Sequence, residues 1–276
     1  MTQADTHSTK IAFIGGGNMA SALIGGLLKV GTPAKDIKVI EPEPEARDRL
    51  EARFGVQTWG SPGAFLQECD LTVWAVKPQV FKEAALAAAQ FCSHHLHLSV
   101  AAGIPTPSIS KWLGINRIAR AMPNTPALVG LGQTGLFATQ EVSSKDKARI
   151  EDILSPTGQF LWVENEVLLD AVTALSGSGP AYVFYFIEAL CQAGEHMGLS
   201  PSAAKQLAIG TFAGASALAS QSDESPSILR ERVTSKGGTT FAALEHMRKQ
   251  GLSQHIQNAL FAAQLRAKEL GEEFGS

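Results

Sequence analysis

A glycine-rich turn near the start of the chain has the residue types and spacing of a phosphate-binding loop. Gly15 and Gly17 follow an apolar run, Ile11–Ile14, and Ala20 lies at the start of a helical pattern over Asn18–Val30. In such a turn the first glycine permits a tight bend, the second lets the backbone approach a pyrophosphate, and the third small residue allows helix–strand packing. Glycine-rich turns are common, but the flanking strand and helix favour dinucleotide binding over a purely structural turn. The residues predicted to bind here are Gly15, Gly17, Asn18 and Met19.

Three further loops follow predicted strands and offer small or polar groups. In a doubly wound sheet, ligands bind outside the carboxyl ends of the strands, where these loops begin. Lys77 is suited to a phosphate or the nicotinamide ribose, and Asn124 to the carboxamide or a phosphate. The alternatives are a solvated loop lysine and a turn residue between prolines. The residues predicted to bind cofactor in these loops are Ala75, Val76, Lys77, Pro78, Ala101, Gly103 and Asn124.

Glu41 ends the second predicted strand, where an acid selects between dinucleotides. A carboxylate there accepts from the adenosine ribose hydroxyls and repels a 2′-phosphate, which favours NAD. Against this, Pro42 and Pro44 can aim the loop elsewhere, and Arg47 or Arg49 can reach a phosphate. These residues are compatible with either NADH or NADPH as the cofactor.

Two segments of the second half combine glycines with hydroxyls at predicted helix starts. Leu175–Tyr182 is expected to break one helix and begin another, with Pro180 at a first helical position. Val233–Thr240 precedes a further helix, and its hydroxyls and N–H groups form a receptor for a small anion, most simply a carboxylate. Ordinary capping by Thr239 or Thr240 does not require two glycines and three further hydroxyls. We therefore interpret this loop as an anion site.

The elements that position these loops fall into two groups. Short apolar runs alternate with helical patterns in the first part, which predicts right-handed crossovers and a doubly wound α/β domain over residues 1–163. Residues 164–276 read as an all-α domain whose small residues permit close helix packing, and we expect it to form a dimer. The predicted strands are Ile11–Ile14, Ile37–Ile40, Leu71–Val76, His97–Val100 and Arg117–Met122, with edge strands at Leu131–Ala138 and Phe160–Val163. The predicted helices of the second domain are Val167–Leu175, Ala181–Met197, Ser202–Ala219, Ser227–Val233, Thr240–Lys249 and Ser253–Leu270.

Composition narrows the classes of function. The 276 residues are 45% hydrophobic and 18% charged, with a net charge of −3 and no basic block, so nucleic acid and anionic membrane are poor partners. The polar first ten residues lack the pattern of a signal peptide, and three widely spaced cysteines suit the reducing cytoplasm. His94, His95 and His97 have no nearby carboxylate or cysteine to complete a metal site, and we expect a solvated turn there instead.

Six segments together give the chain a resemblance to the pyrroline-5-carboxylate reductase family. They fall in order from about residue 10 to 250, and the two in the second half are the most specific. The segments are Phe13–Ala20, Ala75–Gln79, Ser99–Gly103, Met122–Pro126, Ser176–Tyr182 and Val233–Thr240.

The resemblance implies a Rossmann domain followed by a helical dimerisation domain, with an active site completed across the dimer and dimers that often assemble into decamers. It implies hydride transfer from NAD(P)H to the C=N carbon of Δ1-pyrroline-5-carboxylate, giving L-proline. Lys77 and Asn124 match cofactor-side loops. Most members prefer NADPH, from which Glu41 is a departure. The residues that match the substrate carboxylate loop are Ser235, Gly237, Gly238, Thr239 and Thr240.

This chemistry requires few catalytic side chains, because a protonated cyclic imine is already electrophilic and rate comes from holding it against the nicotinamide. Thr240 and Ser176 are the candidates for orienting the ring nitrogen or relaying a proton. A β-hydroxyacid dehydrogenase would carry a catalytic lysine after its second glycine-rich segment, and Ala181–Phe186 has none. Another imine reductase of this plan remains an alternative. A non-catalytic dinucleotide sensor would show a degraded anion loop, whereas this loop is intact.

Overall fold

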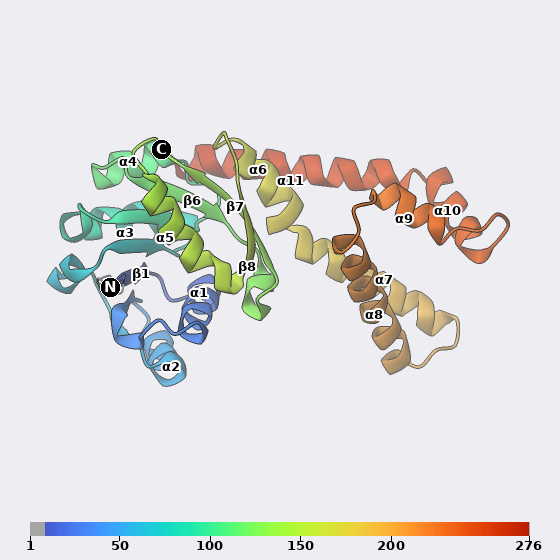
Figure 1. Cartoon of the computed structure of the whole chain (residues 1–276), viewed down its shortest axis with the longest axis horizontal. Helices are drawn as coiled ribbons and strands as arrows, with labels where there is room; N and C mark the ends of the chain where they lie inside the picture. Colours follow the sequence, from blue (N-terminus) through green and yellow to red (C-terminus); the bar gives the residue numbers. More distant parts are fainter. Residues whose placement is uncertain (1–8, 276) are drawn as a thin grey trace, which may run out of the picture. The chain divides into compact units, whose positions relative to one another are not determined.

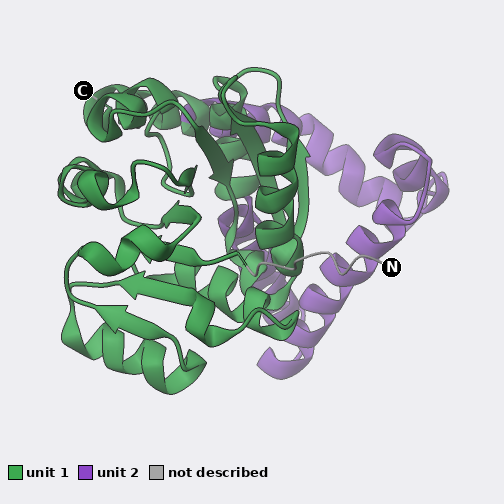
Figure 2. Ribbon diagram, turned by 60° about the vertical axis from the view of Figure 1, so that its left-hand side comes forward, with its two compact units in different colours: residues 1–178, 263–276 green, residues 179–262 purple. Residues whose placement is uncertain are grey.

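The computed structural model describes residues 9–275, which form two compact units (Figure 2). The first contains the chain up to Ser178 together with Ala263 onwards, and the second contains Gly179–Ala262. The units divide after Ser178 because the short helix α6 (Leu168–Val172) packs on strand β7 of the first unit. The domain boundary expected after residue 163 remains a prediction.

An eight-stranded sheet forms the centre of the first unit (Figure 1). Its order is β3-β2-β1-β4-β5-β6-β7-β8, and the strands from β3 to β6 in this order are parallel. Strand β7 runs antiparallel to β6, and β8 pairs parallel with β7 at the edge. The bounds are β1 (Ile11–Ile14), β2 (Ile37–Ile40), β3 (Gln57–Trp59), β4 (Leu71–Trp74), β5 (Leu96–Ser99), β6 (Ile118–Met122), β7 (Gly132–Ala138) and β8 (Gly158–Trp162).

Helices cover both faces of this sheet because successive strand side chains point to opposite sides. Ile11 and Phe13 pack in one core with α1 (Asn18–Lys29), α2 (Pro44–Phe54) and α5 (Ser144–Leu154). Ala12 and Ile14 pack in the other with α3 (Pro78–Cys92) and α4 (Thr106–Leu113). The predicted doubly wound α/β class is confirmed. Strand β3 was not predicted, because Gln57 and Thr58 do not form an apolar run.

The expected solvated histidine turn is confirmed for His94, which is exposed in a turn before β5, and is wrong for the other two histidines. His95 and His97 are buried, with His97 on β5. Trp74 Nε1 donates to His97 Nδ1 (3.0 Å), and Thr72 Oγ1 lies 2.7 Å from His95 Nδ1. Neighbouring strands supply these partners, and local sequence does not display them. Within the described residues, no group of three or more His, Cys, Asp or Glu is arranged to hold a metal ion.

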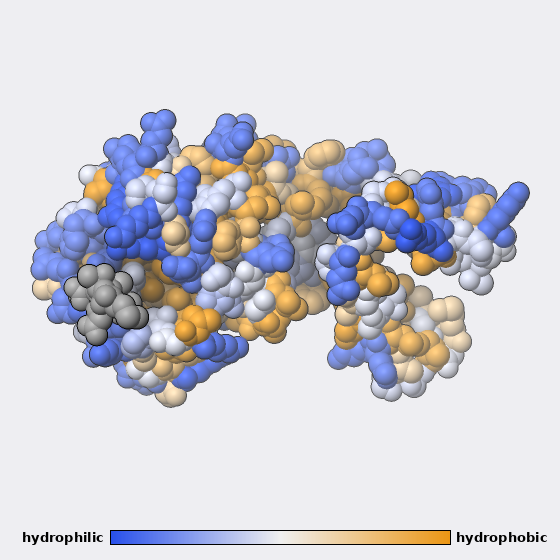
Figure 3. Space-filling model, viewed as in Figure 1, coloured by the Kyte–Doolittle hydropathy of each residue, from blue (hydrophilic) through white to orange (hydrophobic). Residues whose placement is uncertain are grey.

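The second unit consists of helices, as predicted. These are α7 (Gly179–His196), α8 (Pro201–Ser220), α9 (Pro226–Arg232), α10 (Thr239–Lys249) and the start of α11 (Leu252–Phe274). Helices α7 and α8 approach closely at Gly194, where an added Cβ would lie 3.0 Å from Ala204 Cβ. Small residues therefore set this contact. Apolar side chains are exposed on the surface of this unit (Figure 3).

The segment expected to break one helix and begin another contains one π-helical turn, Thr173–Gly177, directly after α6. The Ser178 N–H donates to the Thr173 carbonyl oxygen (2.8 Å), which is the i→i+5 bond of that turn. Gly177 packs on Met122, whose Cε would lie 2.5 Å from an added Cβ. Helix α7 then begins at Gly179 with Pro180 as its second residue, so the expected start of a new helix at this motif is confirmed.

Across residues 9–275, no helix combines the length and the hydropathy that a membrane span requires.

Candidate functional site

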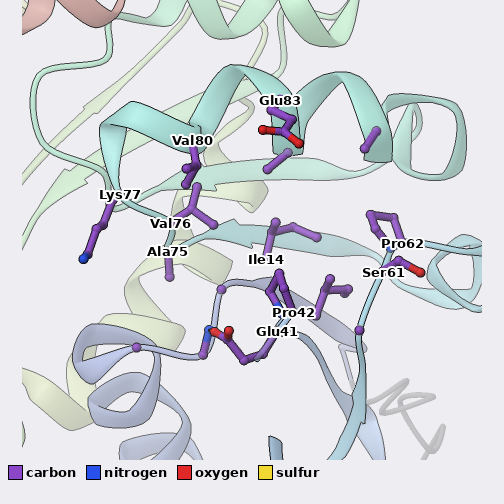
Figure 4. A pocket seen from close by; sticks show the side chains of 17 residues that line it. Ile14, Glu41, Pro42, Ser61, Pro62, Ala75, Val76, Lys77, Val80 and Glu83 are labelled. Carbon is purple, nitrogen blue, oxygen red and sulfur yellow. The ribbon is translucent and has the colours of Figure 1, made fainter. Parts of the chain in front are cut away.

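A cavity of about 480 Å³ lies in the first unit at the carboxyl ends of β1, β2, β3 and β4 (Figure 4). Strand order reverses between β1 and β4, and such a switch point is where doubly wound sheets bind ligands. Six of the predicted residues line it, namely Gly15, Gly17, Glu41, Ala75, Val76 and Lys77. The site is therefore assembled from loops far apart in sequence, as the strand pattern predicted.

The two glycines of the first turn serve different purposes. Gly15 has φ +99°, and an added Cβ would lie 2.7 Å from the Ala75 carbonyl oxygen, so the fold itself requires glycine there. Gly17 has φ −71°, and an added Cβ would meet no described atom within 4 Å. Its open side leaves room for a ligand to reach the backbone.

Helix α1 begins at this turn without help from a side chain. Gly17 is its N-cap residue, and no described side chain caps it. The first N–H groups of a helix lack partners within the helix, and the helix dipole favours an anion beside them. The turn and the helix start together fit a pyrophosphate group.

Glu41 faces the cavity, and main-chain donors hold its carboxylate. The Gly16 N–H donates to Glu41 Oε2 (2.9 Å) and the Glu43 N–H to Oε1 (3.1 Å). Arg47 Nη1 donates to the carbonyl oxygens of Glu41 (2.9 Å) and Pro42 (2.7 Å). The prolines do not turn Glu41 away, because it lines the cavity beside Pro42 (Figure 4).

The rest of the wall comes from residues that sequence reasoning missed. Gly60, Ser61 and Pro62 follow β3, and the Gly-Ser-Pro run after Trp59 is a turn signal that could have found them. Helix α3 supplies a wall that includes Val80 and Glu83. It begins at Pro78, with Lys77 as its N-cap residue. Its cavity-facing positions depend on how the helix lies on the sheet, which no local pattern displays.

Asn124 lies outside the cavity lining and is bonded to the π-helical turn. Its Nδ2 is 3.2 Å from both the carbonyl oxygen and the Oγ of Ser176, and its Oδ1 accepts from the Gln133 N–H (2.9 Å). Ser176 Oγ in turn donates to the Gln133 carbonyl oxygen (3.2 Å). The structure thus brings together two predicted site residues, Asn124 and Ser176. The cofactor contact predicted for Asn124 stays a prediction.

The loop after β5 does not line the cavity. Ala101 is buried in the core beneath α3 and α4, and Gly103 packs against Gly271 near the end of α11. Gly103 lines a second cavity of about 380 Å³, beside an ion pair between Arg120 Nη1 and Glu166 Oε1 (2.7 Å). The predicted cofactor residues outside the first cavity are Asn18, Met19, Pro78, Ala101, Gly103 and Asn124.

The predicted anion loop of the second unit has an uncapped helix start. Gly237 has φ +76°, a backbone conformation that favours glycine. Gly238 is the N-cap residue of α10, and no described side chain caps the helix, so Thr239 and Thr240 do not act as the cap. An added Cβ at Gly238 would lie 2.6 Å from Ser235 Oγ. The N–H groups of this helix start and the Ser235 hydroxyl therefore lie together, an arrangement that suits a small anion.

Two known protein families match different parts of the chain, one in the first half and one in the second. Residues 166–270 match the family described as pyrroline-5-carboxylate reductase dimerisation. Residues 10–103 match the family described as NADP oxidoreductase, coenzyme F420-dependent.

Individual relatives match over nearly the whole chain. The pyrroline-5-carboxylate reductase of Pseudomonas aeruginosa is 42% identical over 268 residues, which covers 96% of this chain and 98% of that protein. The solved structure of the Coxiella burnetii pyrroline-5-carboxylate reductase has a TM-score of 0.89 and 39% identity, covering 96% of this chain and 99% of that one. The Plasmodium falciparum pyrroline carboxylate reductase, solved with NADP bound, has a TM-score of 0.86 and 30% identity, covering 95% and 98%.

Proposed function

The chain belongs to the pyrroline-5-carboxylate reductase family, and on that premise we propose that it reduces Δ1-pyrroline-5-carboxylate to L-proline with NAD(P)H. The observation that carries this function is 42% identity over 96% of the chain to a reductase of that name. The cavity at the strand switch point supports it, because it offers a dinucleotide an uncapped helix start and an open glycine.

The dinucleotide supplies the hydride when bound. We propose that the turn Gly15–Met19 holds its pyrophosphate, that Glu41 holds the adenosine ribose, and that the loop Ala75–Pro78 lies along the nicotinamide half. The uncapped α1 N-terminus and the absence of a side chain at Gly17 support the first assignment. The hydrogen-bonded carboxylate of Glu41 at the cavity wall supports the second.

The loop Ser235–Thr240 is the proposed receptor for the substrate carboxylate. Its support is the uncapped start of α10 and the Ser235 hydroxyl beside Gly238. A protonated imine accepts hydride at carbon without a strong acid or base, so the task of the protein is orientation. Ser176 Oγ is already bonded to Asn124 and Gln133, which supports Thr240 as the hydroxyl that orients the ring nitrogen.

The dimerisation region over residues 166–270 supports homo-oligomerisation. We propose a homodimer as the basic assembly, a decamer as its larger form, and the cytoplasm as its location. Exposed apolar side chains on α7 and α8 support contact between copies.

An absorbance assay at 340 nm tests the function. The purified chain is mixed with pyrroline-5-carboxylate and either NADH or NADPH, and proline is measured in the same samples. We expect substrate-dependent loss of absorbance matched mole for mole by proline. Binding of dinucleotide without turnover would instead indicate a sensor, and no consumption with either cofactor would contradict the proposal.

A further inference from the structure

Glu41 directly follows β2, and its carboxylate is held by hydrogen bonds at the wall of the cavity. In doubly wound folds, the residue ending the second strand meets the adenosine ribose, and an acid or an arginine there separates NAD from NADP. We propose that Glu41 makes this site selective for NADH over NADPH. The inference rests on the proposed function, because it specifies the cofactor of that same site.

Hydrogen bonding positions Glu41 for ribose hydroxyls. Each carboxylate oxygen accepts one main-chain N–H, from Gly16 at 2.9 Å and from Glu43 at 3.1 Å. A carboxylate has about four acceptor positions, so each oxygen keeps capacity for a further donor. The 2′- and 3′-hydroxyls of a ribose are two such donors. Because the two N–H groups already orient the carboxylate, little side-chain freedom is lost on binding.

Of the two neighbouring arginines, one is bonded to the main chain beside Glu41 and the other is exposed near an acid. Arg47, which follows the same strand, directs Nη1 to the carbonyl oxygens of Glu41 and Pro42 (2.9 and 2.7 Å). Arg49 is exposed and lies 3.9 Å from Glu45. A 2′-phosphate placed at Glu41 would therefore meet a carboxylate and an arginine already bonded to main chain.

The charge of the cavity wall also favours NADH over NADPH. Among the described residues that line it, the charged ones are Glu41, Glu83 and Lys77. Lys77 is the N-cap residue of α3 and follows β4, whereas Glu41 follows β2. The β2 side of the wall is thus acidic. A phosphate with two negative charges is repelled there, while the neutral hydroxyl of NADH is accepted.

Direct binding in the absence of imine tests the selectivity. Dissociation constants for NADH and NADPH are measured by nucleotide fluorescence at fixed ionic strength for the natural chain, Glu41→Gln and Glu43→Gln. We expect the natural chain to bind NADH at least about tenfold more tightly than NADPH, since like charges at close range are repelled. Glu41→Gln should reduce that ratio by about tenfold, because it removes the charge and keeps an acceptor for the Gly16 N–H.

Glu43→Gln is the matched control. It removes the same charge two residues away from an exposed side chain outside the cavity lining, so it should change the ratio by less than about twofold. A melting temperature for each variant checks that the fold is retained, and Glu41→Ala gives a second charge-removing variant if Glu41→Gln is unstable. Equal or tighter binding of NADPH by the natural chain, or an unchanged ratio in both Glu41 variants, overturns the inference.

The kinetic assay separates this inference from the function beneath it. Imine reduction with a preference for NADPH would contradict the proposed selectivity and support the proposed function. Tight, selective NADH binding without imine reduction would support the selectivity and contradict the function. Failure to bind either dinucleotide would contradict both.

Discussion

At the scale of single residues, Gly15 and Gly17 show two different reasons for the same amino acid. Gly15 is required by the fold, since φ is +99° and the Ala75 carbonyl oxygen leaves no room for a Cβ. Gly17 adopts φ −71°, which any residue tolerates, and its missing side chain leaves open space. The first glycine thus concerns stability, whereas the second leaves open space at the proposed pyrophosphate site.

Substitutions at the two positions should separate these effects. Gly17→Val should cost less than about 1 kcal/mol of unfolding free energy, yet weaken dinucleotide binding by about a hundredfold by covering the approach to the backbone, which corresponds to about 2.7 kcal/mol. Gly15→Ala should cost about 1–3 kcal/mol through backbone strain and the contact with Ala75. Urea unfolding and nucleotide fluorescence measure the two quantities. Undiminished binding by a folded Gly17→Val variant would refute the pyrophosphate assignment.

Thr240 offers a second residue-level prediction. Thr240→Ala should raise the KM for the imine about tenfold, the loss expected when one hydrogen bond to a charged group is removed, and should leave the KM for NAD(P)H unchanged. Thr234→Val is the control, because Thr234 Oγ1 already donates to the Arg230 carbonyl oxygen (2.6 Å) and should not affect either KM. Unchanged imine kinetics in Thr240→Ala would contradict the carboxylate-loop assignment.

At the scale of elements, buried polar side chains of β4 and β5 form a layer that takes no part in the proposed function. The layer consists of Thr72, Trp74, His95 and His97. Burial in the core lowers the pKa of His97 to about 3, with the neighbouring His95 adding to the shift. Burial likewise lowers the pKa of His95 to about 4. Trp74 Nε1 donates to His97 Nδ1, and His97 Nε2 lies 3.0 Å from the Cys92 carbonyl oxygen, which together suit the neutral ring.

The buried histidines of this layer predict that the folded chain loses stability in acid. Unfolded histidine titrates near pH 6.5, so below that pH the unfolded chain binds protons that the folded chain excludes. The stabilisation is fully present above about pH 6.5 and is lost as pH falls toward the folded value. From pH 7 to pH 5, His97 alone should cost about 2 kcal/mol of unfolding free energy. Urea unfolding at the two pH values measures it. His97→Gln retains an acceptor for Trp74 and should flatten the slope, and an equally steep slope in that variant would exclude His97 as its source.

The segment between β8 and α7 contains a π-helical turn that its local sequence pattern did not predict. Ser, Gly and Pro together indicate a helix break, and the structure has a π-helical turn there, followed by Ser178 and the start of α7 at Gly179. Packing of Gly177 on Met122 and the bonds from Asn124 to Ser176 accompany that turn. Both partners lie about fifty residues earlier in the chain, so the competing tertiary contacts were invisible in the motif itself.

At the scale of the whole molecule, the second unit exposes more apolar surface than an isolated helical unit should. Tyr185 and Met197 of the α7 region are 72% and 78% exposed, and Leu218 of α8 is 69% exposed. Large contiguous apolar surface in a soluble protein marks a contact with another molecule. The dimerisation family matched by this region makes a second copy the partner.

Light scattering tests that assembly. At micromolar concentration the natural chain should have at least twice the 29.2 kDa mass of one copy. Placing charges on α7 with Phe184→Glu and Tyr185→Glu should shift it toward one copy, because a buried unpaired carboxylate is costly. Val30→Glu, at an exposed position after α1 in the first unit, should leave the mass unchanged. A mass of one copy for the natural chain would contradict the proposed dimer.

Sequence alone determined the features that depend on neighbouring residues. Contiguous apolar runs predicted β1, β2 and the later edge strands, and small residues at fixed spacing predicted the turn Gly15–Ala20. The six family segments identified the reductase family, which the relatives confirm. Each of these signals is local, because backbone dihedrals, strand burial and motif identity are written into adjacent positions.

Tertiary structure alone decided which of the predicted groups meet. It placed Glu41 in the cavity wall with a hydrogen bond from the Gly16 N–H, left Ala101 and Gly103 outside the cavity lining, and bonded Asn124 to Ser176. It also added strand β3, whose half-exposed residues form a strand only by pairing with β2. The reason is physical: a hydrogen bond or a close approach needs a partner, and here each partner is brought near by folding across tens of residues.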